Sequence, residues 1–160
     1  MLFRSESKWL WFPFPGHLIV GNWCRFHLCT QIGEYLISTV GRYVHPRHSK
    51  GSEIAEANYL RENPNGEEIG FGRHYETMVF KVTGKICTAP GCGCAMPEID
   101  GAECGFDGYE NPQAALIGHR KMCEWVASGK IKDAPRKPKR NAALMGDEDA
   151  RRGARKDGRP

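Results

Sequence analysis

The chain has 160 residues, a length that fits one domain with an appendage. Its 40% hydrophobic content is ordinary for a folded protein, and its 19 glycines and 10 prolines indicate many turns. The net charge is +4, but the positive excess belongs to residues 130–160, which hold 11 Lys or Arg against 5 Asp or Glu, whereas residues 1–129 hold 12 against 14. This distribution excludes a uniformly basic domain, and composition alone identifies neither a substrate nor a reaction.

The amino-terminal segment, residues 1–22, is rich in aromatic residues and prolines. Pro13, Pro15 and Gly16 interrupt its apolar run well before the roughly 20 residues that a membrane-spanning helix needs. We therefore expect no integral membrane segment here and expect residues 1–22 to pack on the body of the protein. A peripheral contact with a membrane or a partner, made through the aromatic residues, is the alternative.

A β-hairpin is predicted directly after this segment. Residues 23–32 alternate in the manner of a strand, and residues 35–40 are rich in β-branched and aromatic side chains. Gly33-Glu34 supplies a turn between the two segments.

Two further strands are predicted later in the chain. Residues 75–82 form the first of them, and Thr83-Gly84 turns the chain into a short strand at residues 85–87. That short strand would deliver Cys87 to a cysteine-rich loop, residues 87–108.

Two helices carry recognisable start and stop signals. Ser52 is a good N-cap for a short helix that Asn63 and the following proline would end. Asn111 and Pro112 predict the start of the principal helix, which should run to about residue 128. The stripe expected to face the sheet consists of Leu116, His119, Cys123 and Val126.

These elements predict an α+β fold in which a small antiparallel β-sheet is packed by one principal C-terminal helix. The globular domain is expected to span residues 23–129. The sheet residues expected to be buried beneath the helix are Phe26, Leu28, Met78 and Phe80.

The carboxy-terminal segment, residues 130–160, is expected to be a disordered basic tail. It lacks an apolar period and is broken by prolines, so it cannot bury enough surface to offset its ordering entropy. Its cations can neutralise nucleic-acid phosphates, although a solvated tail that aids solubility explains the same composition. The candidate nucleic-acid-binding residues are Arg136, Lys137, Lys139, Arg140, Arg151, Arg152, Arg155 and Lys156.

Seven cysteines are the most informative feature of the chain. The odd number and the absence of a convincing signal peptide favour reduced thiols in the cytoplasm over a disulfide framework. Thiolates and imidazoles are the usual ligands of zinc, and glycines let a loop fold closely around an ion. We predict a structural zinc site with ligands drawn from Cys87, Cys92, Cys94, His119 and Cys123.

Other interpretations of the cysteines remain open. Five candidates compete for four places, Cys104 is a sixth, and Cys92 and Cys94 lack the two-residue spacing of a paired knuckle. The thiols can also be buried core residues, with His119 an interior histidine whose hydrogen bonds are satisfied. Catalytic or redox-active thiols are a third interpretation.

A small enzyme is a rival interpretation of the whole chain. His74 and Glu76 are two residues apart in a predicted strand, so they share a face, as a general acid and base would require. A polar strand surface explains the pair equally well. The chain contains no phosphate-binding glycine loop and no serine nucleophile elbow.

Several segments resemble those of small uncharacterised proteins encoded by tailed bacteriophages and prophages. The resemblance runs from about Trp9 to Trp125 and does not cover the tail. The similar segments are residues 12–18, 23–27, 37–41, 72–80 and 91–94. The resemblance implies expression in a bacterial host cell. It assigns no catalytic residue, because that family has no established activity.

The interpretation favoured by the sequence is a phage-type accessory protein, a non-enzymatic and zinc-supported module that binds a host protein or nucleic acid. An enzyme using His74, Glu76 or a cysteine is one alternative, and a component of the phage particle is another. The sequence does not indicate an oligomeric state.

Overall fold

The computed structural model describes residues 8–13 and 23–133 of the chain. Its strands form one antiparallel sheet in the order β1-β2-β3-β4-β5, so each strand pairs with the strand that precedes it in the chain. The strands are β1 (Trp9–Trp11), β2 (Cys24–Ile32), β3 (Tyr35–Tyr43), β4 (Tyr75–Ile86) and β5 (Pro97–Tyr109).

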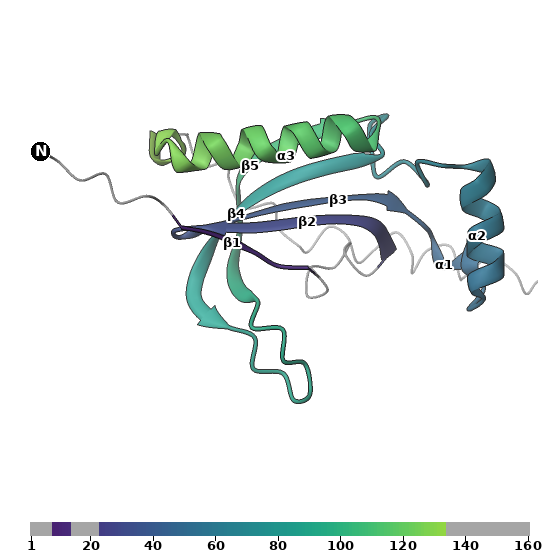
Figure 1. Cartoon of the computed structure of the whole chain (residues 1–160), viewed down its shortest axis with the longest axis horizontal. Helices are drawn as coiled ribbons and strands as arrows, with labels where there is room; N and C mark the ends of the chain where they lie inside the picture. The colour runs from purple at the N-terminus through teal and green to yellow at the C-terminus, as the bar shows by residue number, and fades with distance from the viewer. Residues whose placement is uncertain (1–7, 14–22, 134–160) are drawn as a thin grey trace, which may run out of the picture.

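The helices are α1 (Pro46–Ser49), α2 (Glu53–Glu62) and α3 (Pro112–Ala127), and a short 3-10 helix follows at Lys130–Asp133. Helix α3 lies along one face of the sheet, whereas α1 and α2 stand beyond one end of it (Figure 1). This arrangement confirms the predicted α+β fold with a principal carboxy-terminal helix. In the described part of the chain, none of the helices has the length and apolar character needed to span a bilayer.

The β2–β3 hairpin forms as predicted. Gly33, with φ of 57°, takes the left-handed turn conformation that glycine adopts without strain. Thr30 pairs with Ile37 across the hairpin, and β3 continues to Tyr43, three residues beyond the predicted end.

The β4–β5 hairpin corrects the predicted course of the chain. Instead of turning at Thr83-Gly84, β4 continues to Ile86 and pairs with a strand that occupies most of the predicted loop at residues 87–108. That strand, β5, is rich in glycine and acidic residues, which are poor strand formers, so cross-strand pairing decided its conformation. The cysteine-rich connection is therefore the hairpin tip between Ile86 and Pro97.

Both predicted helices are present with their predicted caps. Ser52 Oγ accepts a hydrogen bond from the Ala55 amide at the start of α2, and Asn111 Oδ1 accepts one from the Ala114 amide at the start of α3. The predicted buried stripe of α3 is wrong at Leu116, which is 56% exposed. The buried residues of α3 are Ala115, Gly118, His119, Cys123 and Val126.

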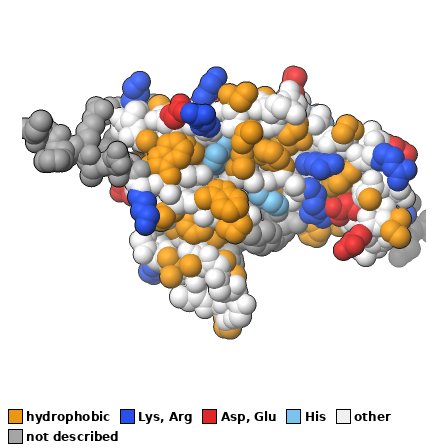
Figure 2. Space-filling view, in the orientation of Figure 1, with side chains coloured by type: hydrophobic (Ala, Val, Ile, Leu, Met, Phe, Trp, Pro, Cys, Tyr) orange, Lys and Arg blue, Asp and Glu red, His pale blue; other side chains and the backbone are white. Residues whose placement is uncertain are grey.

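The core has two parts, one on each face of the sheet, and further hydrophobic side chains remain visible on the surface (Figure 2). Beneath α3, the buried cluster consists of Ile32, Ile37, Val79, Cys123, Val126 and Ile131. On the opposite face, a smaller cluster consists of Cys29, Leu36 and Met96, with Phe12 packed against it. The core extends beyond residue 129, the predicted end of the domain, because the Ile131 side chain is only 4% exposed.

The expected buried sheet residues are only half-buried. Val79 is fully buried under α3, and since side chains alternate along a strand, its neighbours Met78 and Phe80 lie on the other face. Phe26 and Leu28 are also half-buried. The prediction was therefore wrong about which face of β4 packs beneath α3.

Candidate metal centre

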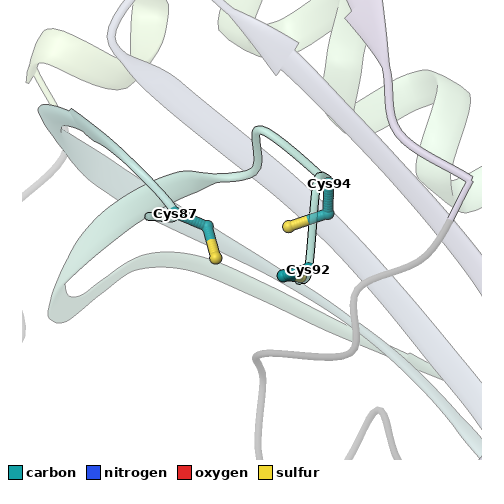
Figure 3. Close-up of side chains that lie close together, drawn as sticks. All are labelled: Cys87, Cys92 and Cys94. Atoms are coloured by element: carbon teal, nitrogen blue, oxygen red, sulfur yellow. The ribbon is translucent and has the colours of Figure 1, made fainter. Parts of the chain in front are cut away.

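Three cysteine thiols meet at the tip of the β4–β5 hairpin. Cys87 directly follows β4, and Cys92 and Cys94 lie in the connection to β5. Their three Sγ atoms lie within 4.8 Å of one another. Figure 3 shows that the sulfur atoms face a common space.

Backbone conformation brings the thiols together. The Cys87 amide donates to the Met96 carbonyl at 2.7 Å, which closes the base of the tip, and the Cys92 amide donates to the Ala89 carbonyl at 3.1 Å. Gly91 and Gly93 have φ angles of 75° and 63°, in the left-handed region. A Cβ atom at either glycine would meet nothing within 4 Å, so the tip requires glycine for its backbone freedom rather than for space.

The thiols influence one another's protonation. Cys92 is exposed, and Cys87 and Cys94 are half-buried. The side-chain hydrogen bond with Cys94 raises the pKa of Cys92, and the neighbouring Cys87 sulfur raises it further. Without a cation, the Cys92 thiol thus holds its proton more firmly than an isolated thiol does. A bound metal ion reverses this preference, because it is a larger local charge and deprotonates the thiols that it binds.

The spacing suits a soft divalent ion. Zinc–thiolate bonds of about 2.3 Å in a tetrahedron place the sulfurs roughly 3.8 Å apart, a separation compatible with three Sγ atoms that lie within 4.8 Å of one another. Three thiolates leave one tetrahedral position. No fourth Cys, His, Asp or Glu joins the three thiols within residues 8–13 and 23–133, so the described residues alone do not fill that position.

His119 and Cys123 are not near this cluster, which corrects the predicted ligand set. They lie on α3, which packs on one face of the sheet, whereas the hairpin tip extends away beyond the other (Figure 1). The His119 ring nitrogens Nε2 and Nδ1 are hydrogen-bonded to Thr30 Oγ1 at 2.9 Å and Thr39 Oγ1 at 2.7 Å. Burial lowers the pKa of His119 to about 4. This is the satisfied interior histidine of the alternative interpretation.

The remaining cysteines belong to the body of the fold. Cys123 is part of the buried cluster beneath α3, and Cys104 packs against the same cluster. Burial raises the pKa values of Cys24 and Cys29 to about 12, so these thiols hold their protons firmly. All seven cysteines lie in the described part of the chain, and none of them forms a disulfide there.

The proposed acid–base pair lies at the start of β4. Glu76 is 7% exposed, and burial raises the pKa of its carboxyl group, while the nearby Arg73 acts in the opposite direction. His74 is half-buried, and its Nδ1 atom has no hydrogen-bond partner within the described residues. The pair therefore lies in a buried, partly unsatisfied setting rather than on a fully solvated strand surface.

The candidate nucleic-acid-binding residues of the tail, 136–156, lie outside the described residues. Comparisons with known proteins add no assignment, because no family model, curated protein or solved structure matches the chain.

Proposed function

We propose that this protein is a non-enzymatic binding module whose β4–β5 hairpin tip is held by a zinc ion. The observation that carries the proposal is the convergence of Cys87, Cys92 and Cys94 within 4.8 Å at the end of a long hairpin. A structural zinc contributes its binding free energy to folding, and such a contribution suits a glycine-rich connection that has few side chains to bury.

The position of the cluster supports a role in binding. Cys92 is exposed, so the fourth coordination position can be filled by water or by a side chain of a partner. We propose a host macromolecule as that partner. Three adjacent thiols stay available to a metal ion only in a reducing compartment. We propose that this compartment is the cytoplasm of a bacterial host and that the chain is a phage-type accessory protein.

The test is metal content together with cysteine replacement. The full-length chain, purified under reducing conditions without added metal, should contain one zinc per molecule by elemental analysis. Cys87→Ser and Cys92→Ser should each lose most of it, because two thiolates hold zinc far less tightly than three. Cys104→Ser is the matched control, since this half-buried cysteine lies outside the cluster and should leave the zinc content unchanged.

The experiment also has results that would reject the proposal. Wild-type protein that remains metal-free after incubation with zinc and desalting would remove the metal site. Full zinc content in both Cys87→Ser and Cys92→Ser would show that the metal is held elsewhere.

A further inference from the structure

The β4–β5 hairpin tip holds the thiol that solvent reaches most easily. Cys92 is the one exposed cysteine among the seven of the chain. Three others, Cys24, Cys29 and Cys123, are at most 1% exposed, and burial raises the pKa of each of these thiols to about 11 or 12. Because thiol oxidation follows exposure and thiolate character, a small oxidant in solution reacts at the tip and spares these core cysteines.

The three thiols of the tip lie close enough to react with one another. The Sγ atoms of Cys87, Cys92 and Cys94 lie within 4.8 Å, and they face a common space (Figure 3). Cys92 interacts by side-chain hydrogen bonding with each of the other two. A disulfide needs a sulfur separation of about 2.05 Å, so a modest shift of the connection would bring Cys92 within bonding distance of either neighbour.

The connection that carries these thiols can change shape without disturbing the core. Residues 88–93 are all exposed, so the described part of the chain does not cover them. A Cβ atom at Gly91 or Gly93 would meet nothing within 4 Å, which leaves the backbone room to move. Met96, by contrast, is 2% exposed, and its carbonyl accepts a hydrogen bond from the Cys87 amide. The base of the tip is therefore anchored while its end is free to rearrange.

Ala95 marks the tip as a place where the backbone is held against its preference. Its φ of 50° is in the left-handed region, which is unfavourable for alanine. Such conformations persist where neighbouring contacts impose them, and they cluster at functional sites. A metal ion held by the adjacent Cys94 would supply such a contact, and loss of the ion would let the backbone relax.

The coordination available at the tip differs from that of a closed structural site. Structural zinc sites commonly have four protein ligands, whereas reactive sites keep a position open. The described residues offer three thiolates, and one of them, Cys92, stays exposed. A ligand sulfur that solvent reaches is open to oxidation even while it binds the metal.

We propose that the hairpin tip is a redox-modification site, at which a peroxide converts Cys92 and one neighbouring cysteine into a disulfide and so releases the zinc ion. The inference rests on the proposed function for the zinc that is released, and it adds the regulation of that site. The disulfide step itself requires only the three thiols. Without zinc the tip changes shape, and the contact that it makes with a partner is lost.

The reaction balances with hydrogen peroxide as a two-electron oxidant. The Cys92 thiolate attacks one peroxide oxygen, the O–O bond breaks, and a sulfenic acid and a hydroxide form. The thiolate of Cys87 or Cys94 then attacks the Cys92 sulfur, so that an S–S bond forms, the S–O bond breaks and a second hydroxide leaves. Two protons from solvent convert the hydroxides to water. The two sulfurs together lose the two electrons that the peroxide gains, and the single remaining thiolate holds zinc far more weakly than three.

The test is graded hydrogen peroxide treatment of the zinc-loaded, full-length protein. A chromogenic chelator measures released zinc, and mass spectrometry after thiol alkylation locates the disulfide. Zinc release should follow disulfide formation one for one, and the disulfide should join Cys92 to Cys87 or Cys94. Dithiothreitol with added zinc should restore the starting form. This measurement uses wild-type protein, so it does not depend on whether a variant folds.

Cysteine variants identify the role of each thiol. Cys92→Ser should slow disulfide formation at the tip at least about tenfold, because the exposed sulfur is missing. Replacement of both neighbours, Cys87→Ser together with Cys94→Ser, should leave a sulfenic acid on Cys92 that dimedone traps, because no adjacent thiol resolves it. Cys104→Ser is the matched control, since this half-buried cysteine lies outside the tip and its loss should leave the reaction unchanged.

Other results would overturn the inference. It fails if peroxide releases zinc without forming a disulfide, or if the disulfide joins two chains or excludes Cys92. Zinc and thiols that stay intact at peroxide concentrations that oxidise a free thiol would identify a closed structural site, so the zinc proposal would stand and this inference would fail. A wild-type chain that holds no zinc but forms the Cys92 disulfide would reject the proposed zinc function and support the redox-modification site.

Discussion

Acidification should destabilise the fold through His119, which lies between α3 and the sheet. Burial lowers the pKa of this imidazole from 6.5 to about 4. Between these two pH values the unfolded chain binds a proton that the folded protein excludes, so the free energy of unfolding falls as the pH falls. Each unit of pKa shift corresponds to about 1.4 kcal/mol, which gives a loss on the order of 3 kcal/mol from this one residue, levelling off below about pH 4.

The assay is urea unfolding of wild type and His119→Gln at a series of pH values between 7 and 4. The variant lacks the titrating group, so the difference between the two unfolding free energies should shrink or change sign toward pH 4, with wild type losing more. Other groups titrate in this range, among them Glu76, whose raised pKa stabilises the folded state at low pH and acts in the opposite direction. Their contributions cancel in the difference.

A pH-independent difference between wild type and His119→Gln would refute this reasoning. It would mean that His119 is solvated in the native protein and that the hydrogen bonds to Thr30 and Thr39 do not hold it in a buried site.

Three further measurements test the packing and the metal chemistry. Gly118→Ala should lower the free energy of unfolding by roughly 1–3 kcal/mol, because the new Cβ would lie 2.1 Å from Tyr109 Cζ. The measurement is chemical denaturation, and a variant more stable than wild type would contradict the contact between α3 and β5. Leu36→Ala should lower the free energy of unfolding by about 2–5 kcal/mol, whereas Leu116→Ala should change it by less than about 0.5 kcal/mol. The reverse order would mean that Leu116 is a core residue, as the sequence predicted. Zinc binding should release protons, which is measured by calorimetry in buffers of different ionisation enthalpy, and Cys92→Ser should bind less zinc and release fewer protons for each zinc bound.

The sequence was sufficient for elements with local signals. Caps at Ser52 and Asn111, the turn at Gly33 and the alternation of residues 23–32 all correspond to structure, because each signal acts between residues close in the chain. The hairpin of β4 and β5 depends on pairing across a long connection, and β5 itself lacks strand-forming residues. Local propensity could not reveal it.

The candidate metal site was predicted in part for the same reason. Cys87, Cys92 and Cys94 are close in sequence, so a short glycine-containing connection brings them together. Whether α3 would meet that connection depended on the direction of the hairpin, which the sequence pattern does not specify. The spacing of His119 and Cys123 correctly indicated one helical face, but that face packs on the sheet.

X-ray absorption spectroscopy at the zinc edge on the metal-loaded full-length protein tests the central proposal most directly, because it counts the sulfur ligands. We predict three sulfur atoms at about 2.3 Å and one lighter ligand, nitrogen or oxygen, at about 2.0–2.1 Å. In Cys92→Ser any residual bound zinc should show two sulfurs. A first shell made only of nitrogen and oxygen, in wild-type protein, would contradict a metal centre formed by Cys87, Cys92 and Cys94.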